Sequence, residues 1–153
     1  MRITTLCCCL AVLTGCAKPE QKAAVMDSTA AQPTAAPISL ASVAGKWNMR
    51  TMLTTSDSVL LTYDMVTTAE PTGWTLTFPN RPTIAVRVLA TEGDSIVTEA
   101  GPYESVLRKG VQVSTHSVMR LKDGKLVGTT LAHYTTTGAD SVLALRTEGT
   151  RAP

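Results

Sequence analysis

Residues 111–135 read VQVSTHSVMRLKDGKLVGTTLAHYT. Two runs of alternating apolar and polar residues flank Asp123-Gly124, and such alternation predicts half-buried β-strands. Gly tolerates the positive φ that a tight turn needs, so Asp-Gly between two strands is a strong hairpin signal. This segment therefore predicts antiparallel strands near 111–121 and 125–135.

The same alternation continues outward from this hairpin towards both ends of the chain. Three strands are expected first, with faces formed by Trp47, Met49, Thr51 and Leu53, by Val59, Leu61, Tyr63 and Met65, and by Trp74, Leu76 and Phe78. Further strands are expected near 83–91, 94–100 and 140–148. The sequence thus predicts an all-β domain of about eight strands.

The connections between these strands are short, as at Glu92-Gly93-Asp94. Parallel strands need crossovers of a dozen residues or more, so consecutive strands should pair antiparallel. Closing such a sheet removes both exposed edges. We therefore expect an eight-stranded antiparallel up-and-down barrel, whose interior side chains fill or one small ligand occupies. The alternative is a β-sandwich or open sheet in which Trp47 is an ordinary core residue.

The N-terminus has the parts of a secretory signal: Arg2, an apolar run over 3–13, and a small-residue cleavage region. The apolar run is too short to span a bilayer, which takes about 20 residues. Leu13-Thr14-Gly15-Cys16 resembles the lipobox of bacterial lipoproteins. The resemblance implies that residues 1–15 are removed and that Cys16 carries the lipid, acyl chains such as palmitate included. The alternative is an ordinary signal with a chance Cys at the cut.

The lipoprotein resemblance also suggests a location. Ala17, and not Asp, follows Cys16, which in that family is typical of sorting to the outer membrane, facing the periplasm. Residues 16–40 are rich in Ala, Thr, Pro and Gln without an apolar period, so they are expected to form a disordered tether. Residues 41–153 would then form the barrel domain. All four cysteines precede residue 17, so that domain has no disulfide or thiolate ligand.

Charge and motifs exclude several function classes. The chain has 14 Lys and Arg against 12 Asp and Glu, without the clustered basic excess of a nucleic-acid binder. His116 and His133 are too few for a zinc site, which usually has three or four ligands. No Gly-x-Ser-x-Gly elbow or Gly-rich phosphate loop occurs. We therefore expect no enzyme, no metal and no cofactor.

Gly45-Lys46-Trp47 stands just before the first expected strand. A Gly-x-Trp there resembles the signature of the lipocalins and their relatives. In that family the Trp closes the barrel floor, a short helical turn precedes it, and an Arg from the end of the last strand packs over it. The resemblance implies that 38–44 supply the turn and that Arg146 or Arg151 supplies the guanidinium. We expect Arg146, because Arg151 lies beyond Gly149 in a tail that should fray.

Residues 101–110 form the longest expected connection and carry Tyr103, Glu104 and Arg108 between glycines. Functional residues concentrate on long loops over rigid scaffolds, so this loop is a candidate for contacting a ligand or a partner. It could equally be a packed loop that caps one end of the barrel. In the seventh strand, Gly128 and Thr130 share a face with Ala132 and Tyr134, which would leave room for a ligand if that face points inward.

Two functions remain open. The first is a membrane-anchored lipoprotein whose barrel binds a small apolar ligand at the envelope surface. The alternative is a structural or interaction lipoprotein whose filled barrel contacts another envelope protein. An interior cavity would distinguish them, because a barrel filled by aromatic side chains has no room for a ligand.

Lipidation is tested at Cys16. The wild-type protein should incorporate radiolabelled palmitate and stay with the membrane fraction, because each buried methylene contributes about 0.8 kcal/mol to anchoring. Cys16→Ser should incorporate no label and should either leave the membrane or remain uncleaved. A wild-type protein without label would show that the anchor is wrong.

Overall fold

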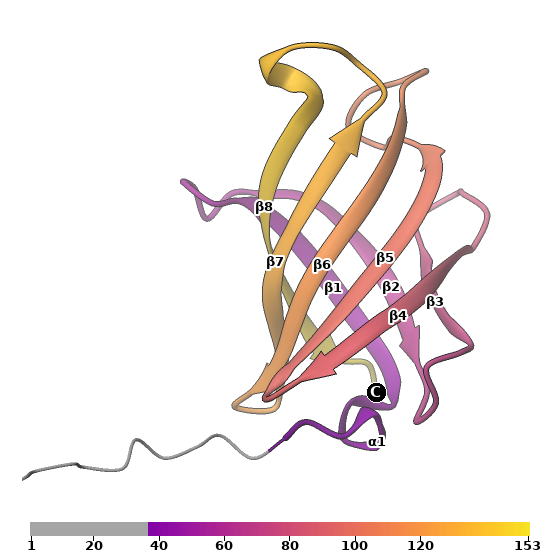
Figure 1. The fold of residues 1–153 in the computed structure, drawn as a ribbon, viewed down its shortest axis with the longest axis vertical. Coiled ribbons are helices and arrows are strands. Elements are labelled where there is room, and N and C mark those ends of the chain that lie inside the picture. The colour runs from indigo at the N-terminus through magenta and orange to yellow at the C-terminus, as the bar shows by residue number, and fades with distance from the viewer. Residues whose placement is uncertain (1–36) are drawn as a thin grey trace, which may run out of the picture. The chain divides into compact units, whose positions relative to one another are not determined.

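The computed structural model describes residues 37–153, so the signal segment, Cys16 and most of the expected tether lie outside the described residues. Within 37–153, eight strands close into one antiparallel barrel in which each strand pairs with the next and β8 pairs with β1 (Figure 1). The elements are α1 (Leu40–Val43), β1 (Gly45–Leu53), β2 (Val59–Thr67), β3 (Trp74–Thr77), β4 (Ile84–Glu92), β5 (Ser95–Glu104), β6 (Gln112–Lys122), β7 (Lys125–Tyr134), a 3-10 turn (Ala139–Ser141) and β8 (Val142–Arg151). The predicted fold class is confirmed.

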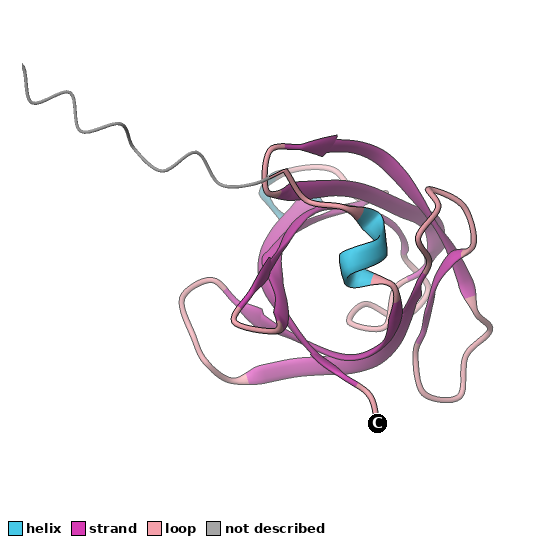
Figure 2. Ribbon diagram, turned by 90° about the horizontal axis from the view of Figure 1, so that it is seen from below, coloured by secondary structure: helices cyan, strands magenta, loops and turns pink. Residues whose placement is uncertain are grey.

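The barrel has two different ends. At one end, α1 lies across the opening, as the view from below shows (Figure 2); we call it the α1 end. The opposite end, which we call the loop end, carries the connections 54–58, 78–83, 105–111 and 135–141. The helical turn expected before Trp47 is therefore present and covers the barrel floor.

The β6–β7 hairpin forms as predicted. Asp123 and Gly124 have φ values of 51° and 75°, and a turn with both central residues at positive φ matches the right-handed twist of the strands it joins. In the resulting register His116 lies opposite Leu131. The local sequence was sufficient to predict this hairpin because both strands and the turn between them are contiguous in the chain.

The 101–110 connection is shorter than predicted. β5 continues through this segment to Glu104, so the connection to β6 covers only 105–111. The pairing with β6 shifts between Ala100 and Tyr103, and Gly101 has a φ of 109°. A side chain there would meet the Val113 carbonyl at 2.7 Å. Gly101 thus permits a bulge after which the strand resumes, whereas the sequence pattern predicts a strand that ends before this glycine.

The boundary of the barrel domain also extends beyond its predicted start. Ile38 and Leu40, which composition assigned to the tether, pack against the core. The Ile38 N–H donates to the Gly93 carbonyl over 2.7 Å. Two apolar residues in a polar stretch are a weak signal, but here they cover the α1 end of the barrel.

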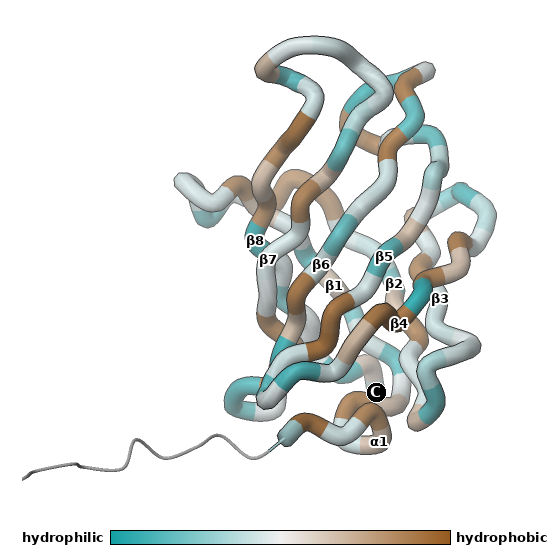
Figure 3. The backbone as a smooth tube through the Cα atoms, in the orientation of Figure 1, coloured by the Kyte–Doolittle hydropathy of each residue, from teal (hydrophilic) through white to brown (hydrophobic). Residues whose placement is uncertain are grey.

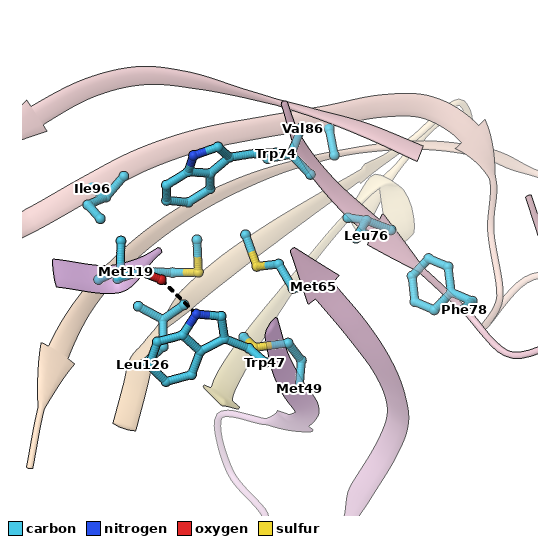
Figure 4. Close-up of a cluster of buried hydrophobic side chains, with 12 residues drawn as sticks. Trp47, Met49, Met65, Trp74, Leu76, Phe78, Val86, Ile96, Met119 and Leu126 are labelled. Carbon is cyan, nitrogen blue, oxygen red and sulfur yellow. Dashed lines mark hydrogen bonds between the residues drawn. The ribbon is translucent and has the colours of Figure 1, made fainter. Parts of the chain in front are cut away.

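A cluster of apolar side chains fills the half of the barrel next to α1 (Figure 4). Along the strands, apolar and polar residues alternate as a half-buried sheet requires (Figure 3). The buried cluster consists of Val43, Trp47, Met49, Met65, Trp74, Leu76, Phe78, Val86, Ile96, Ala100, Met119 and Leu126. This half of the interior therefore offers no space for a ligand.

Gly128 allows β6 and β7 to approach closely. A Cβ atom at this position would collide with the Val118 carbonyl oxygen and lie 2.9 Å from the Met119 Cα. Both are backbone atoms of a paired strand, which cannot give way without breaking the ladder. The residue is therefore required by packing and not by turn geometry.

Gly128→Ala should accordingly lower the free energy of unfolding by about 1–3 kcal/mol, the usual cost of overpacking. Urea denaturation followed by circular dichroism measures it. Thr129→Ala, a change at the exposed neighbour, is the matched control and should cost less. Equal losses in the two variants would refute the close contact.

Candidate functional site

The floor of the barrel is built around Trp47. This residue is fully buried, and its indole Nε1 donates to the Val43 carbonyl of α1 over 2.8 Å. The Thr67 hydroxyl, at the end of β2, donates to the same carbonyl over 2.5 Å. The carbonyl groups at the end of a helix have no hydrogen-bond partner within the helix. The Val43 carbonyl is such a group, and it accepts two hydrogen bonds from side chains of the barrel. Trp47 thereby fixes α1 onto the barrel.

Arg151 covers the other side of the indole. Its guanidinium carbon lies 4.5 Å from the centre of the Trp47 ring, within the range of a cation–π interaction. Its Nη1 donates to the Ala44 carbonyl over 2.8 Å and its Nη2 to the Ser42 carbonyl over 2.7 Å. The last residue of β8 therefore joins the helix to the first strand, and the tail does not fray there.

The expected pairing of Trp47 with Arg146 is wrong. In the register of β1 against β8, Trp47 lies opposite Arg151 and Met52 opposite Arg146. The two arginines are five positions apart, which is about 17 Å along a strand. Arg146 lies near the loop end, on the outer face, where it forms an ion pair with Asp57. Alternation puts the two arginines on opposite faces of β8, but which of them meets Trp47 depends on a register that joins segments about a hundred residues apart.

An interior cavity of about 60 Å³ occupies the loop-end half of the barrel. Its lining includes all three tyrosines of the described residues and several hydroxyl side chains, with no charged residue among them. The lining residues are Thr51, Leu61, Tyr63, Phe78, Tyr103, Ser105, Val106, Leu107, Val113, Thr115, Ser117, Thr130, Ala132, Tyr134 and Leu145. Thr130, Ala132 and Tyr134 thus face inward, which decides the orientation that the sequence left open for this face of the seventh strand.

Two hydroxyl groups of the lining, those of Ser117 and Thr130, form a connected row with the buried hydroxyl of Thr147. The Ser117 and Thr130 hydroxyls lie 2.7 Å apart, and the Thr130 and Thr147 hydroxyls lie 3.1 Å apart. Burial raises the pKa of the Tyr63 and Tyr103 phenols, with hydrogen bonds from Thr51 and Thr115 opposing the shift in part. Both phenols therefore stay neutral at physiological pH, and the cavity combines neutral hydrogen-bonding groups with apolar surface.

The 105–111 connection forms a roof over the cavity. The Ser105 hydroxyl accepts hydrogen bonds from the backbone N–H groups of Leu107 and Arg108, over 3.1 and 3.0 Å. The Arg108 guanidinium lies 4.0 Å from the centre of the Tyr134 ring and donates to the Asp140 carbonyl over 2.6 Å. The roof is therefore fastened both within the loop and to the neighbouring β7–β8 connection.

The three candidate residues of this loop do not form one site. Tyr103 lines the cavity, whereas the Glu104 carboxylate accepts a hydrogen bond from the Gly110 N–H over 3.2 Å. Arg108 fastens the roof and does not line the cavity. The 105–111 connection is thus a packed cap that lines the cavity with Ser105, Val106 and Leu107, whereas Tyr103 reaches the cavity from β5.

A larger hollow of about 860 Å³ lies on the outside of the barrel, and we call it the outer groove. Glu148 lies in it and accepts from Arg50 and Lys125, each over 2.9 Å. These two cations, Lys125 first, lower the pKa of the Glu148 carboxyl. The groove is lined by Asn48, Met49, Arg50, Thr62, Tyr63, Asp64, Thr77, Phe78, Pro79, Asn80, Arg81, Lys125, Glu148 and Thr150.

The histidines occupy the outer wall. His133 is exposed, and His116 is half-buried on the face opposite to the cavity residues Thr115 and Ser117. Among residues 37–153, no group of three or more His, Cys, Asp or Glu could hold a metal ion. The same part of the chain contains no helix long and apolar enough to cross a membrane.

Comparisons of the chain with protein-family models, with curated proteins and with solved structures find no match. The functional conclusions therefore depend on the residues and geometry described above.

The Trp47–Arg151 contact is tested by a double-mutant cycle. Trp47→Ala should cost about 3–5 kcal/mol through lost burial and the cavity left behind. Arg151→Ala should show a coupling with Trp47→Ala of about 0.5 kcal/mol or more, as residues in contact do. The matched control is Arg146→Ala, which should be additive with Trp47→Ala. Coupling to Arg146 alone would contradict the register of β1 against β8.

Proposed function

We propose that this protein is a lipoprotein of the bacterial envelope whose barrel binds a small neutral molecule in its loop-end cavity. The observation that carries the proposal is the uncharged lining of that cavity, which combines aromatic rings, hydroxyl groups and apolar side chains. Ligand sites are typically apolar hollows with a few convergent polar groups. The lipobox resemblance at Leu13–Cys16 supports the anchor, and Ala17 supports the outer membrane as its place.

The lining also indicates the chemistry of the ligand. A charged ligand would lose its hydration without meeting a countercharge, which is costly. A ligand with an aromatic or short aliphatic body and one hydroxyl would contact the tyrosine rings and could reach the hydroxyl row at Ser117 and Thr130. The ligand class that we propose is therefore a small phenol or alcohol.

The size of the cavity limits the ligand. Cavities that hold drug-sized molecules measure about 300–1,000 Å³, and one of about 150 Å³ holds benzene. The 60 Å³ cavity must widen to accept a ring. Val106 and Leu107 line it from the roof and Tyr63 and Phe78 from the side, so a ring-sized ligand requires one of these boundaries to move.

The kinship with lipocalins belongs to the same proposal. Trp47 on the barrel floor, the short helix before it and a guanidinium from the last strand over the indole all agree with the resemblance. In that arrangement the closed floor leaves the opposite half of the barrel for the ligand.

The alternative, an interaction lipoprotein with a filled barrel, is favoured by one observation. Leu131 and Val142 are 42% and 45% exposed on the outer wall of β7 and β8, and exposed apolar side chains are common where proteins contact each other. A ligand-binding test of the cavity decides between the two functions.

That test uses 4-fluorophenol, followed by fluorine NMR. The wild-type protein should bind it, and Ala132→Phe should weaken binding at least about tenfold, equivalent to 1.4 kcal/mol, because the new ring occupies the cavity. Leu131→Phe is the matched control on the outward face of the same strand and should bind like the wild type. Circular dichroism verifies that both variants fold.

4-Fluorobenzoate, a charged molecule of similar shape, should bind at least about tenfold more weakly than 4-fluorophenol because the lining has no countercharge. Absence of 4-fluorophenol binding in the wild type would reject the proposed function. Equal binding by Ala132→Phe would place the ligand outside the cavity.

A further inference from the structure

The wall of the barrel is incomplete on one side. β2 pairs with β3 at only three positions, from Asp64 to Val66, and β4 pairs with β5 only from Val86 onward. Nearer the loop end, residues 59–63 of β2 pair with β1 alone, and residues 103–104 of β5 pair with β6 alone, among the described strands. The β3–β4 turn therefore ends below β5 to β8 (Figure 1) and leaves a gap between β2 and β5.

Three aromatic side chains close this gap in place of backbone hydrogen bonds. The ring centre of Phe78 lies 5.3 Å from that of Tyr63 on β2 and 5.9 Å from that of Tyr103 on β5. Phe78 is 5% exposed and follows directly after the last residue of β3. Its ring thus fills the position that a longer β3–β4 hairpin would occupy.

The gap lies between the two hollows of the molecule. Tyr63 and Phe78 line both the interior cavity and the outer groove. The rings of these two residues therefore lie between a space of about 60 Å³ inside the barrel and a larger one of about 860 Å³ outside it. Rotation of the Phe78 side chain would join them and would also provide the widening that a ring-sized ligand needs.

Fewer side-chain hydrogen bonds fasten the side of the barrel than the roof. Phe78 lies outside the strand ladders, and the turn that carries it is tied across the gap by one side-chain hydrogen bond, from Arg81 Nη1 to the Glu104 carbonyl over 2.8 Å. The roof is held by the Ser105 hydroxyl, by the stacking of Arg108 on Tyr134 and by the bond of Arg108 to Asp140. Opening at Phe78 breaks no strand pairing.

We infer that the ligand enters and leaves the cavity through the side of the barrel, from the outer groove past the Phe78 ring, and not through the roof at the loop end. This inference rests on the proposed function, because it concerns access to the same cavity. The outer groove then serves as the entrance for a neutral molecule, with Tyr63 and Phe78 as its inner boundary.

The experiment measures exchange of 4-fluorophenol with the full-length chain by fluorine saturation-transfer NMR. Phe78→Leu, which shortens the side chain and removes the ring, and Arg81→Ala, which releases the turn, should each raise the dissociation rate about tenfold. Because a wider entrance speeds entry and exit together, the dissociation constant should change less than the rate. Arg108→Ala, which loosens the roof, should leave the exchange rate within about twofold of wild type.

The outcomes separate the two hypotheses. If Arg108→Ala accelerates exchange while Phe78→Leu and Arg81→Ala do not, the ligand passes through the roof and the side entrance is wrong, although the cavity still binds. If all three variants exchange at the wild-type rate, neither the ring nor the turn controls access, and the inference is also overturned. If the wild-type protein does not bind the probe at all, the proposed function fails and the entrance fails with it.

Discussion

The closure of β1 on β8 is the constraint on which the remaining structure depends, and Trp47 and Arg151 fix its position. Trp47 and Arg151 are directly paired across the two strands. The Ala152 N–H extends the ladder by donating to the Lys46 carbonyl over 2.9 Å. A slip by one residue would turn every side chain of a strand to the other face. Because Arg151 bonds to Ser42 and Ala44 as well, the same contact that sets the register also holds α1 over the floor.

Closure divides the interior into two unlike halves. Beside the floor, two tryptophans and methionines such as Met49, Met65 and Met119 pack into one cluster (Figure 4). Flexible thioether side chains suit this place, since they fill the irregular space between rigid indoles. Towards the loop end, the inward positions carry hydroxyl groups and tyrosines instead. The first half stabilises the barrel, which leaves the second half able to hold polar groups and an unfilled volume.

The parts of the fold that depend on local sequence were predictable, and those that depend on distant register were not. Strand alternation and the turn at Asp123-Gly124 predicted eight strands and their order, and the resemblance carried by Gly45-Lys46-Trp47 implied the position of Trp47 at the floor. The prediction that Arg146 and not Arg151 packs over Trp47 was wrong, because this contact depends on how β8 aligns with β1. Alternation grouped the cavity residues of β7 on one face but did not decide whether that face points inward. The contact of Phe78 with Tyr63 and Tyr103 depends on where β3 and β4 end.

The short β3–β4 hairpin has a consequence for the mechanics of the barrel. Around most of the described barrel, opening the wall would break backbone hydrogen bonds between paired strands, as in the ladders of β5 to β8. Between β2 and β5 the wall is held by contacts among three aromatic rings and one arginine hydrogen bond. A rotation of the Phe78 side chain breaks none of these backbone hydrogen bonds. A barrel can therefore keep a stable ladder and still admit a molecule, provided that a side chain replaces the ladder at one place, and Phe78 occupies that place.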